Sequence, residues 1–216
     1  MLLKKFFKTN LTVSLLLILS FAIIVINFFR FFQNNSVYEF DSWLSNYQGG
    51  FVRRGMPGEL FFQIHELLNF HPGWMVFIFV CVLYFLFYFS FFHLIKDIKL
   101  NKLFIFAIFS PISFFFPILN SKATGQKEII FLSLLSIFCF FLPKLKKSYA
   151  NFFMIFIALL IGLSHEGLIF YLFYLIITFI FFYNFKNLKN IFFNLLPIFF
   201  VMVSMLFLTY HFHGTE

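Results

Sequence analysis

Long apolar runs, separated by short polar segments, constrain the fold of this chain more than any other feature. Several runs extend for roughly 15 to 22 residues, and a helix needs about 20 residues to cross about 30 Å of hydrocarbon. Of the 216 residues, 62% are hydrophobic and 11% are charged, and the mean hydropathy is +0.96. A soluble core cannot bury this much apolar surface. The sequence therefore predicts an all-α, polytopic bundle of transmembrane helices.

The runs predict about seven spans within a single integral membrane domain, residues 1–216. The first run is too long for the apolar part of a signal peptide and lacks a small-residue cleavage site, so it is expected to remain as a span. The stretch 150–183 is interpreted as a hairpin of two short spans, in which Ser164 caps the second. The expected spans are 11–32, 74–95, 103–119, 128–142, 150–163, 167–183 and 191–210.

The distribution of lysine predicts the orientation. With the N-terminus inside, the inner segments carry eleven lysines, whereas the outer segments carry Arg53, Arg54, Lys122 and Lys127. The positive-inside rule favours this orientation. The net charge of +8 is thus a topology signal, and we expect no binding of nucleic acid.

The outer segment 33–73 is expected to contain a helix that lies in the membrane interface. Pro57 suits a first helical position, and apolar residues then recur on one helical face. Trp74 follows at a position that suits an anchor among lipid headgroups. The apolar face consists of Leu60, Phe61, Ile64, Leu67 and Leu68.

A polar, glycine-rich island in this segment predicts an anion site. Arg53 and Arg54 are adjacent, with Gly50 and Gly55 beside them. A guanidinium group matches two phosphate oxygens at once, and glycines allow backbone amides to approach the same anion. The alternative is that the arginines contact lipid headgroups or pair with acidic residues of the same segment.

Further polar residues are expected on the same outer face. Asp41 is a candidate general base or ligand of a divalent metal, and its alternative role is a helix cap or an arginine partner. Lys127 and Glu128 are candidates for substrate binding, although Glu128 also suits the helix dipole. His165 and Glu166 are candidate catalytic residues that would position or protonate the substrate, because they stand at the mouth of the membrane hairpin, where polar residues are costly. Short spans beside these residues predict an outward-facing cavity.

Two other kinds of site are excluded or disfavoured by the sequence. A zinc-protease HExxH motif would need histidine at positions 69 and 169, where the chain has Asn69 and Ile169. Cys81 and Cys139 both lie within apolar runs, so they are expected to be packing residues rather than a disulfide or a reactive thiol.

Three short motifs resemble those of multispan bacterial envelope-glycan proteins. These motifs are Gly-Gly-Phe-Val-Arg-Arg-Gly at 49–55 after an acidic residue, Gly-Gln-Lys-Glu at 125–128, and His-Glu at 165–166. The group includes O-antigen or capsule polymerases and GT-C-like glycosyltransferases that use polyprenyl-linked sugars. In such enzymes an acidic residue of the first outer loop is catalytic, and Asp41, or alternatively Glu39, matches it in position. Members usually have ten or more spans, so this chain resembles a truncated member.

The resemblance implies a protein of surface-polysaccharide assembly in the bacterial inner membrane, with its N-terminus in the cytoplasm. It would be a polymerase or glycosyltransferase that uses undecaprenyl-diphosphate-linked sugar on the extracytoplasmic face. Its partners would be membrane lipid, the lipid-linked glycan and other assembly proteins of the membrane. The alternatives are a flippase or transporter of lipid-linked glycan and a membrane acyltransferase that modifies surface glycans.

Overall fold

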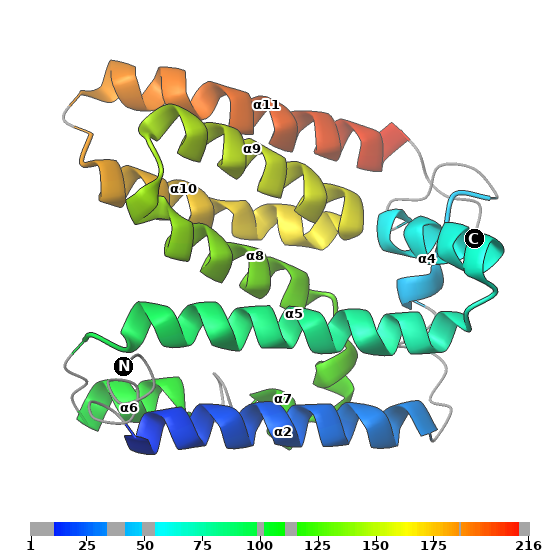
Figure 1. The fold of residues 1–216 in the computed structure, drawn as a ribbon. Helices are drawn as coiled ribbons and strands as arrows, with labels where there is room; N and C mark the ends of the chain where they lie inside the picture. Colours follow the sequence, from blue (N-terminus) through cyan, green and yellow to red (C-terminus); the bar gives the residue numbers. More distant parts are fainter. Residues whose placement is uncertain are drawn as a thin grey trace.

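A computed structural model of the chain describes residues 11–33, 42–48, 55–98, 102–110, 116–185 and 187–211. Within these ranges every regular element is helical (Figure 1). The first half contains α2 (Leu11–Gln33), α4 (Met56–Leu68), α5 (Pro72–Ile95), α6 (Lys102–Ile108), α7 (Phe116–Leu119) and the 3₁₀ turn η1 (Ser121–Gly125). The second half contains α8 (Glu128–Phe141), η2 (Leu142–Lys144), α9 (Lys147–Ser164), η3 (Glu166–Tyr171), α10 (Leu172–Tyr183) and α11 (Leu188–His211).

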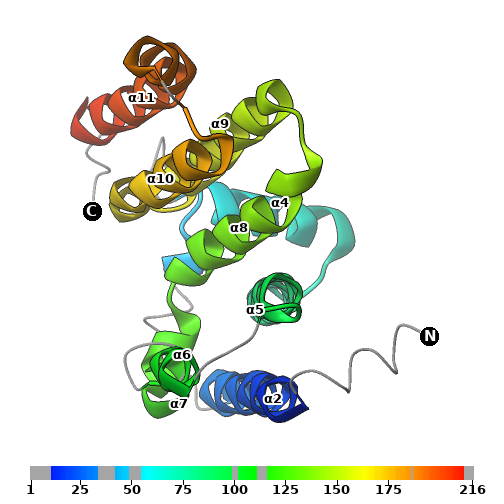
Figure 2. The ribbon, with the colours of Figure 1, turned by 90° about the vertical axis from the view of Figure 1, so that its left-hand side faces the viewer.

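The helices form two packed groups that α8 joins. In Figures 1 and 2, α2 lies beside α5, while α9, α10 and α11 lie together on the other side of α8. Each group has its own buried core. Ile129 and Ile130 of α8 belong to the core around α2 and α5, whereas Phe131 and Phe138 belong to the core around α9 to α11. The two faces of α8 therefore hold the molecule together.

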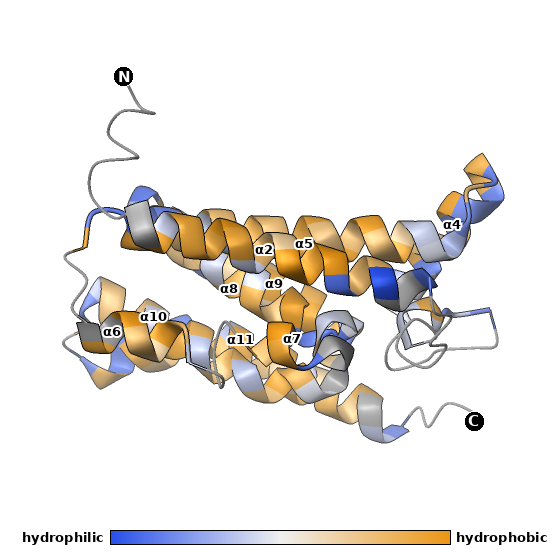
Figure 3. Cartoon of the chain, turned by 90° about the horizontal axis from the view of Figure 1, so that it is seen from below, coloured by the Kyte–Doolittle hydropathy of each residue, from blue (hydrophilic) through white to orange (hydrophobic). Residues whose placement is uncertain are grey.

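Among the residues that the structure describes, four helices are long and apolar enough to cross a membrane. The qualifying windows are Val13–Arg30, Pro72–Ile95, Lys147–Ser164 and Leu188–Leu208. Hydrophobic residues dominate the middle of the bundle in Figure 3, and hydrophilic residues lie toward its ends. The predicted all-helical class, with apolar helices suited to a membrane, is thus confirmed. By contrast, α8 has 14 residues and α10 has 12, about 21 and 18 Å at 1.5 Å per residue.

The span predicted over 103–119 is not one continuous helix. Helix α6 ends at Ile108, Phe109 and Ser110 are not helical, and the next described helix is the single turn α7. Proline explains the break, because it lacks a backbone N–H and disfavours helix in the residue before it. Pro111 follows the end of α6, and Pro117 lies in α7.

Residues 150–183 include a helical hairpin with its turn at the expected place, although its details differ from the prediction. Helix α9 begins at Lys147 and has 18 residues, about 27 Å, so it is longer than the expected 150–163. His165 is extended, and η3 and α10 then run back beside α9 (Figure 1). The predicted cap at Ser164 is wrong. Its hydroxyl donates to Leu160 O within α9, and His165 caps the following turn instead.

The helix predicted after Pro57 is α4, which lies at the end of the bundle where α2 ends and α5 begins (Figure 1). Phe61 is buried and packs edge-on against Phe79 of α5, with ring centroids 5.5 Å apart. Phe61 therefore packs against the bundle, whereas the sequence predicted that it would lie on the apolar face that this helix presents to the membrane interface. The rest of that stripe is exposed and consists of Leu60, Ile64, Leu67 and Leu68.

Substituting Gly58 should destabilise the fold strongly, because a Cβ there would overlap the carbonyl group of Ser45. We expect Gly58→Ala to cost about 3 kcal/mol, the upper range for overpacking, because a backbone group must move. Gly162→Ala is the matched control. Its Cβ would lie 2.9 Å from Cγ of Met205, and this flexible side chain can shift at a cost of about 1 kcal/mol. Circular dichroism of thermal unfolding in detergent micelles measures both, and equal losses would contradict the close approach of residues 42–48 to α4.

Candidate functional site

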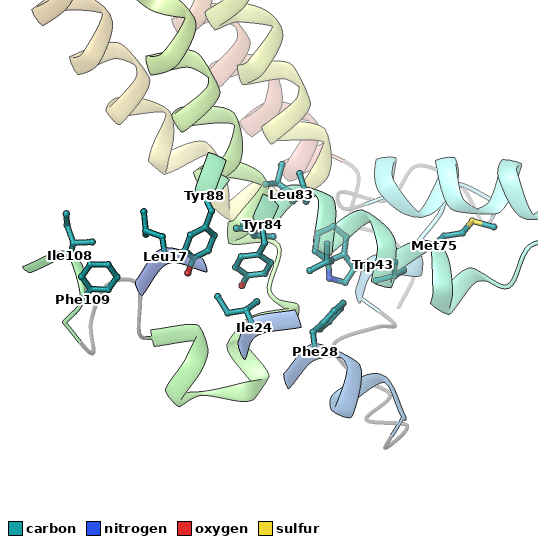
Figure 4. Packing of buried hydrophobic residues seen from close by; sticks show 14 of the residues in the cluster. Leu17, Ile24, Phe28, Trp43, Met75, Leu83, Tyr84, Tyr88, Ile108 and Phe109 are labelled. Atoms are coloured by element: carbon teal, nitrogen blue, oxygen red, sulfur yellow. The ribbon is translucent and has the colours of Figure 1, made fainter. Parts of the chain in front are cut away.

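Trp43 is the anchor of the candidate site. It lies in the segment 42–48, is fully buried, and donates from Nε1 to the carbonyl oxygen of Gly125 at 2.6 Å. Its ring also packs edge-on against Phe79 of α5, with centroids 5.9 Å apart. Figure 4 shows Trp43 within the core that Phe28 and Tyr84 share. An indole provides a large apolar surface together with one N–H donor, and both are used here.

Lys127 extends from the start of α8 into this buried region. Only 3% of its surface is exposed. Its Nζ atom lies 5.7 Å from the centre of the Trp43 ring and donates to the carbonyl oxygen of Ser164 at 3.4 Å. The ring face and the carbonyl oxygen both present negative potential to the ammonium group. A cation is thereby fixed where α8 meets the end of α9.

The site is recessed along α5. Trp43 packs against Phe79, which is seven residues after Pro72 at the start of this helix. At 1.5 Å per residue, the contact lies about 10 Å along α5 from its first turn. Helix α9 ends at Ser164, where Lys127 contacts it, while α11 continues further in the same direction (Figure 1). The polar groups therefore lie inside the bundle, away from the end at which α5 begins.

The segment 42–48 is fastened to α4 next to this site. Glu59 accepts hydrogen bonds from the backbone N–H of Tyr47 at 3.1 Å and from Nε2 of Gln63 at 3.0 Å. Burial raises the pKa of the Tyr47 phenol, and the nearby Glu59 carboxylate raises this pKa further. Tyr47 is thus a neutral hydrogen-bonding group. Gly55 precedes α4, and a Cβ there would overlap the Tyr47 ring.

His165 is the half-buried turn residue of the α9–α10 hairpin. Its Nδ1 atom accepts a hydrogen bond from the N–H of Gly167 at 3.0 Å. A neutral imidazole in this geometry carries its proton on Nε2, which makes Nε2 the donor. The carbonyl oxygen of Ser164 accepts the hydrogen bond from Lys127, and Ser164 directly precedes His165 in the chain. The structure therefore brings the predicted site residue Lys127 to the turn that contains His165.

The remaining predicted site residues are distributed as follows. Glu128 is exposed and begins α8, where a carboxylate complements the helix dipole. Glu166 begins η3, but its side chain lies outside the described part of the structure. Among the described residues, no cluster of three His, Cys, Asp or Glu side chains suits a metal ion. The other predicted residues, Asp41, Gly50, Arg53 and Arg54, lie outside the described ranges.

Two site residues were not singled out from the sequence. Trp43 was one of many polar or amphipathic residues in the outer loop, and Ser164 contributes a carbonyl group that any residue would supply. A usable signal for Trp43 was its rarity, since the chain has two tryptophans and 44 phenylalanines. A tryptophan that is buried usually pairs its indole N–H with an acceptor.

A cavity of about 620 Å³ lies between α5, α7 and α8. Its walls are almost entirely apolar and include Phe87, Phe91, Pro117 and Leu132. Polar residues in its lining are Tyr84, Tyr88, Gln126, Glu128 and Ser136. Its volume lies in the range of small-molecule sites, about 300–1,000 Å³.

Comparison of the chain with protein-family profiles, curated proteins and solved structures finds no match.

Removing the indole donor should lower the free energy of unfolding, although an aromatic ring still fills the core. Trp43→Phe keeps an aromatic ring but leaves the buried Gly125 carbonyl without its Nε1 donor, which costs about 1–3 kcal/mol. Trp74→Phe is the matched control at a position that is 40% exposed, and it should cost about 0.5 kcal/mol or less. Circular dichroism of thermal unfolding compares the two. If the Trp43 variant were as stable as the control, the Trp43–Gly125 bond would carry no stability.

Proposed function

We propose that this is a protein of surface-polysaccharide assembly in the bacterial inner membrane. It would bind the diphosphate of an undecaprenyl-linked sugar on the extracytoplasmic face and act as a glycosyltransferase or polymerase. The observation that supports this most is the buried ammonium group of Lys127, held in a recess between apolar helices. A charge in such surroundings is costly and is characteristic of a functional site.

The charge at this site favours a lipid-linked anion as its ligand. Lys127 precedes α8, whose N-terminus adds the positive end of a helix dipole. Arg53 and Arg54 precede Gly55 in the sequence, and Gly55 contacts Tyr47 at the start of α4. A diphosphate headgroup on a membrane-resident chain would have both the charge and the depth to reach such groups.

The proposed reaction assigns a role to each predicted residue. The bond between the anomeric carbon and the diphosphate oxygen breaks, and the acceptor hydroxyl oxygen forms a new bond to that carbon. Asp41 takes the acceptor proton directly, or holds a divalent metal beside the diphosphate. Lys127, Arg53 and Arg54 stabilise the diphosphate that remains on the lipid. His165, with Glu166, positions the acceptor through its Nε2 donor.

The topology of about seven spans is part of the same proposal. It places the N-terminus in the cytoplasm and α4 in the outer membrane interface. The exposed apolar stripe of α4, which includes Leu67 at 81% and Leu68 at 73% exposure, supports an interfacial position. Helix α11, which carries Lys189 in its first turn, begins at the end of the bundle opposite α4 (Figure 1). This position supports the proposed cytoplasmic location of the lysine-rich segments.

Cysteine labelling tests this orientation. In a Cys81→Ala, Cys139→Ala background, Gln48→Cys should react with a membrane-impermeant maleimide in intact spheroplasts, because residue 48 would lie outside. Lys189→Cys should react only after the membrane is permeabilised. Both positions are exposed in the structure, so access across the membrane decides the result. The reverse pattern would overturn the proposed orientation.

Neutralising Lys127 should weaken binding of undecaprenyl diphosphate by about 30-fold or more, the expected loss when one partner of a buried charge pair is removed. The variant is Lys127→Met, and Lys189→Met, at an exposed position, is the matched control. Binding is measured with purified protein in micelles, and polymer length is measured in cells. Shortened polymer is also expected for Arg53→Ala, Arg54→Ala. Unchanged binding in Lys127→Met would contradict the headgroup site.

One observation favours a second function, a flippase of lipid-linked glycan. The interval 102–141 contains short helices and turns rather than one long helix, and α8 begins beside the middle of α5 (Figure 1). Discontinuous helices whose N-termini face an anionic substrate are typical of transporters. A flippase would move lipid-linked sugar between leaflets of vesicles without forming a glycosidic bond, whereas a glycosyltransferase would lengthen the glycan.

A further inference from the structure

The cavity between α5, α7 and α8 lies between two stripes of helical residues. Its lining positions recur every three or four residues on α5, from Tyr84 to Leu94, and on α8, from Glu128 to Cys139. Positions with this spacing share one face of a helix. The two intervals correspond to about 15 to 17 Å at 1.5 Å per residue. The cavity, of about 620 Å³, therefore follows both helices, and we call it the α5–α8 cavity.

The charge in the α5–α8 cavity is negative. Among the described residues that line it, Glu128 is the only charged one, and it is also exposed, so its carboxylate lies where the cavity opens. Lys127 does not line the cavity, and its Nζ atom instead lies over the Trp43 ring and donates to Ser164 O. Within the described part of the chain, no cation forms an ion pair with the Glu128 carboxylate. A ligand with a positive charge would supply that partner.

The polar atoms of the lining favour a ligand that donates hydrogen bonds. Ser136 Oγ donates its only hydrogen to Ser133 O at 2.8 Å, so it can only accept from a ligand. The Glu128 carboxylate accepts as well, and the phenol oxygens of Tyr84 and Tyr88 have lone pairs for the same purpose. An ammonium group carries donors and no acceptor, and it therefore matches these atoms.

Aromatic rings form much of the remaining wall. Phe87 and Phe91 of α5 and Phe116 of α7 line the cavity together with the two tyrosines. The face of an aromatic ring attracts a cation within about 6 Å of its centre. The same rings supply apolar surface for the uncharged part of a ligand. The wall thus suits a molecule that has both a cationic group and an apolar body.

We propose that the α5–α8 cavity binds an organic ammonium ion, with its nitrogen at Glu128 and its apolar body along α5. An anion would face the Glu128 carboxylate, and a neutral apolar molecule would leave that carboxylate without a partner. A hydrated metal ion would have to give up water to apolar walls. This site goes beyond the proposed function, and neither requires the other, because Lys127 lies outside the cavity.

A matched series of ligands tests the charge preference with the unmodified protein. Radiolabelled 4-phenylbutylammonium is dialysed to equilibrium against protein in phosphatidylcholine nanodiscs, with empty nanodiscs as the background. We expect saturable binding. The compounds 4-phenylbutanol and 4-phenylbutyrate share its body, and they should compete at least tenfold less well. Equal competition by the alcohol would overturn the proposal. So would displacement of the amine when phosphatidylethanolamine is added to the nanodiscs, because the occupant would then be a lipid headgroup.

Neutralising the carboxylate should weaken binding of 4-phenylbutylammonium by about tenfold, as expected for loss of a hydrogen bond between charged groups. The variant is Glu128→Gln. The control is Glu66→Gln, at an exposed position of α4 that does not line the cavity. Glu128→Asp keeps the charge and should bind more tightly than Glu128→Gln. Unchanged affinity in Glu128→Gln, or an equal loss in both glutamine variants, would contradict the site.

A second pair of substitutions tests whether the ligand lies inside the cavity. Leu132→Trp places a larger side chain in the lining and should reduce binding by about tenfold. Leu159→Trp on α9 is the control, because Leu159 is 37% exposed, close to the 39% of Leu132, and does not line the cavity. Circular dichroism checks that both variants fold. Full binding by folded Leu132→Trp would place the ammonium ion outside the cavity and overturn the proposal. If Leu132→Trp did not fold, the smaller Leu132→Phe would have to reproduce a partial loss.

Discussion

The structure depends on pairing backbone carbonyl groups where the chain has no long helix to pair them. Inside an apolar bundle, an unpaired backbone group costs several kcal/mol because no water replaces its partner. In the interval between α6 and α8, side chains from elsewhere supply the donors. Asn27 Nδ2 donates to Ile118 O at 3.4 Å, and Trp43 Nε1 donates to Gly125 O at 2.6 Å. These bonds let a broken segment lie against α2.

The same pairing explains the position of α8. Its first residues follow a turn that Trp43 holds. Ser133 Oγ then lies 2.8 Å from Leu83 O of α5 and 2.6 Å from Ile129 O of its own helix, so its single hydroxyl hydrogen is shared between these two carbonyl groups. A serine at that position allows α8 to approach α5 closely while its hydroxyl remains paired. Lys127 joins α8 to the end of α9. Helix α8 is consequently fixed to both packed groups by hydrogen bonds as well as by its two apolar faces.

Hydropathy predicted the long elements because their stability depends on composition over many residues. The helices α2, α5, α9 and α11 lie close to the predicted spans, and the hairpin turns at His165, where the sequence predicted its mouth. Shorter features depend on individual residues or on distant contacts. Proline explains why 103–119 is broken, and this signal was present in the sequence. The Trp43–Gly125 bond joins residues 82 positions apart, and no local pattern predicts such a contact. For the same reason, the sequence predicted Ser164 only as a helix cap, whereas its carbonyl oxygen accepts a hydrogen bond from Lys127.

The break before α8 also has a functional consequence. A continuous helix through residues 116–141 would be about 39 Å long at 1.5 Å per residue, and Lys127 would then lie within it rather than at an N-terminus. Its carbonyl groups would be paired internally, so Trp43 would have no Gly125 acceptor, and no helix dipole would begin beside the cation. The turns at α7 and η1 instead leave room beside α5, which is the space that the cavity of about 620 Å³ occupies. One break in the helix thus accounts both for the position of the buried cation at the start of α8 and for the space beside α5.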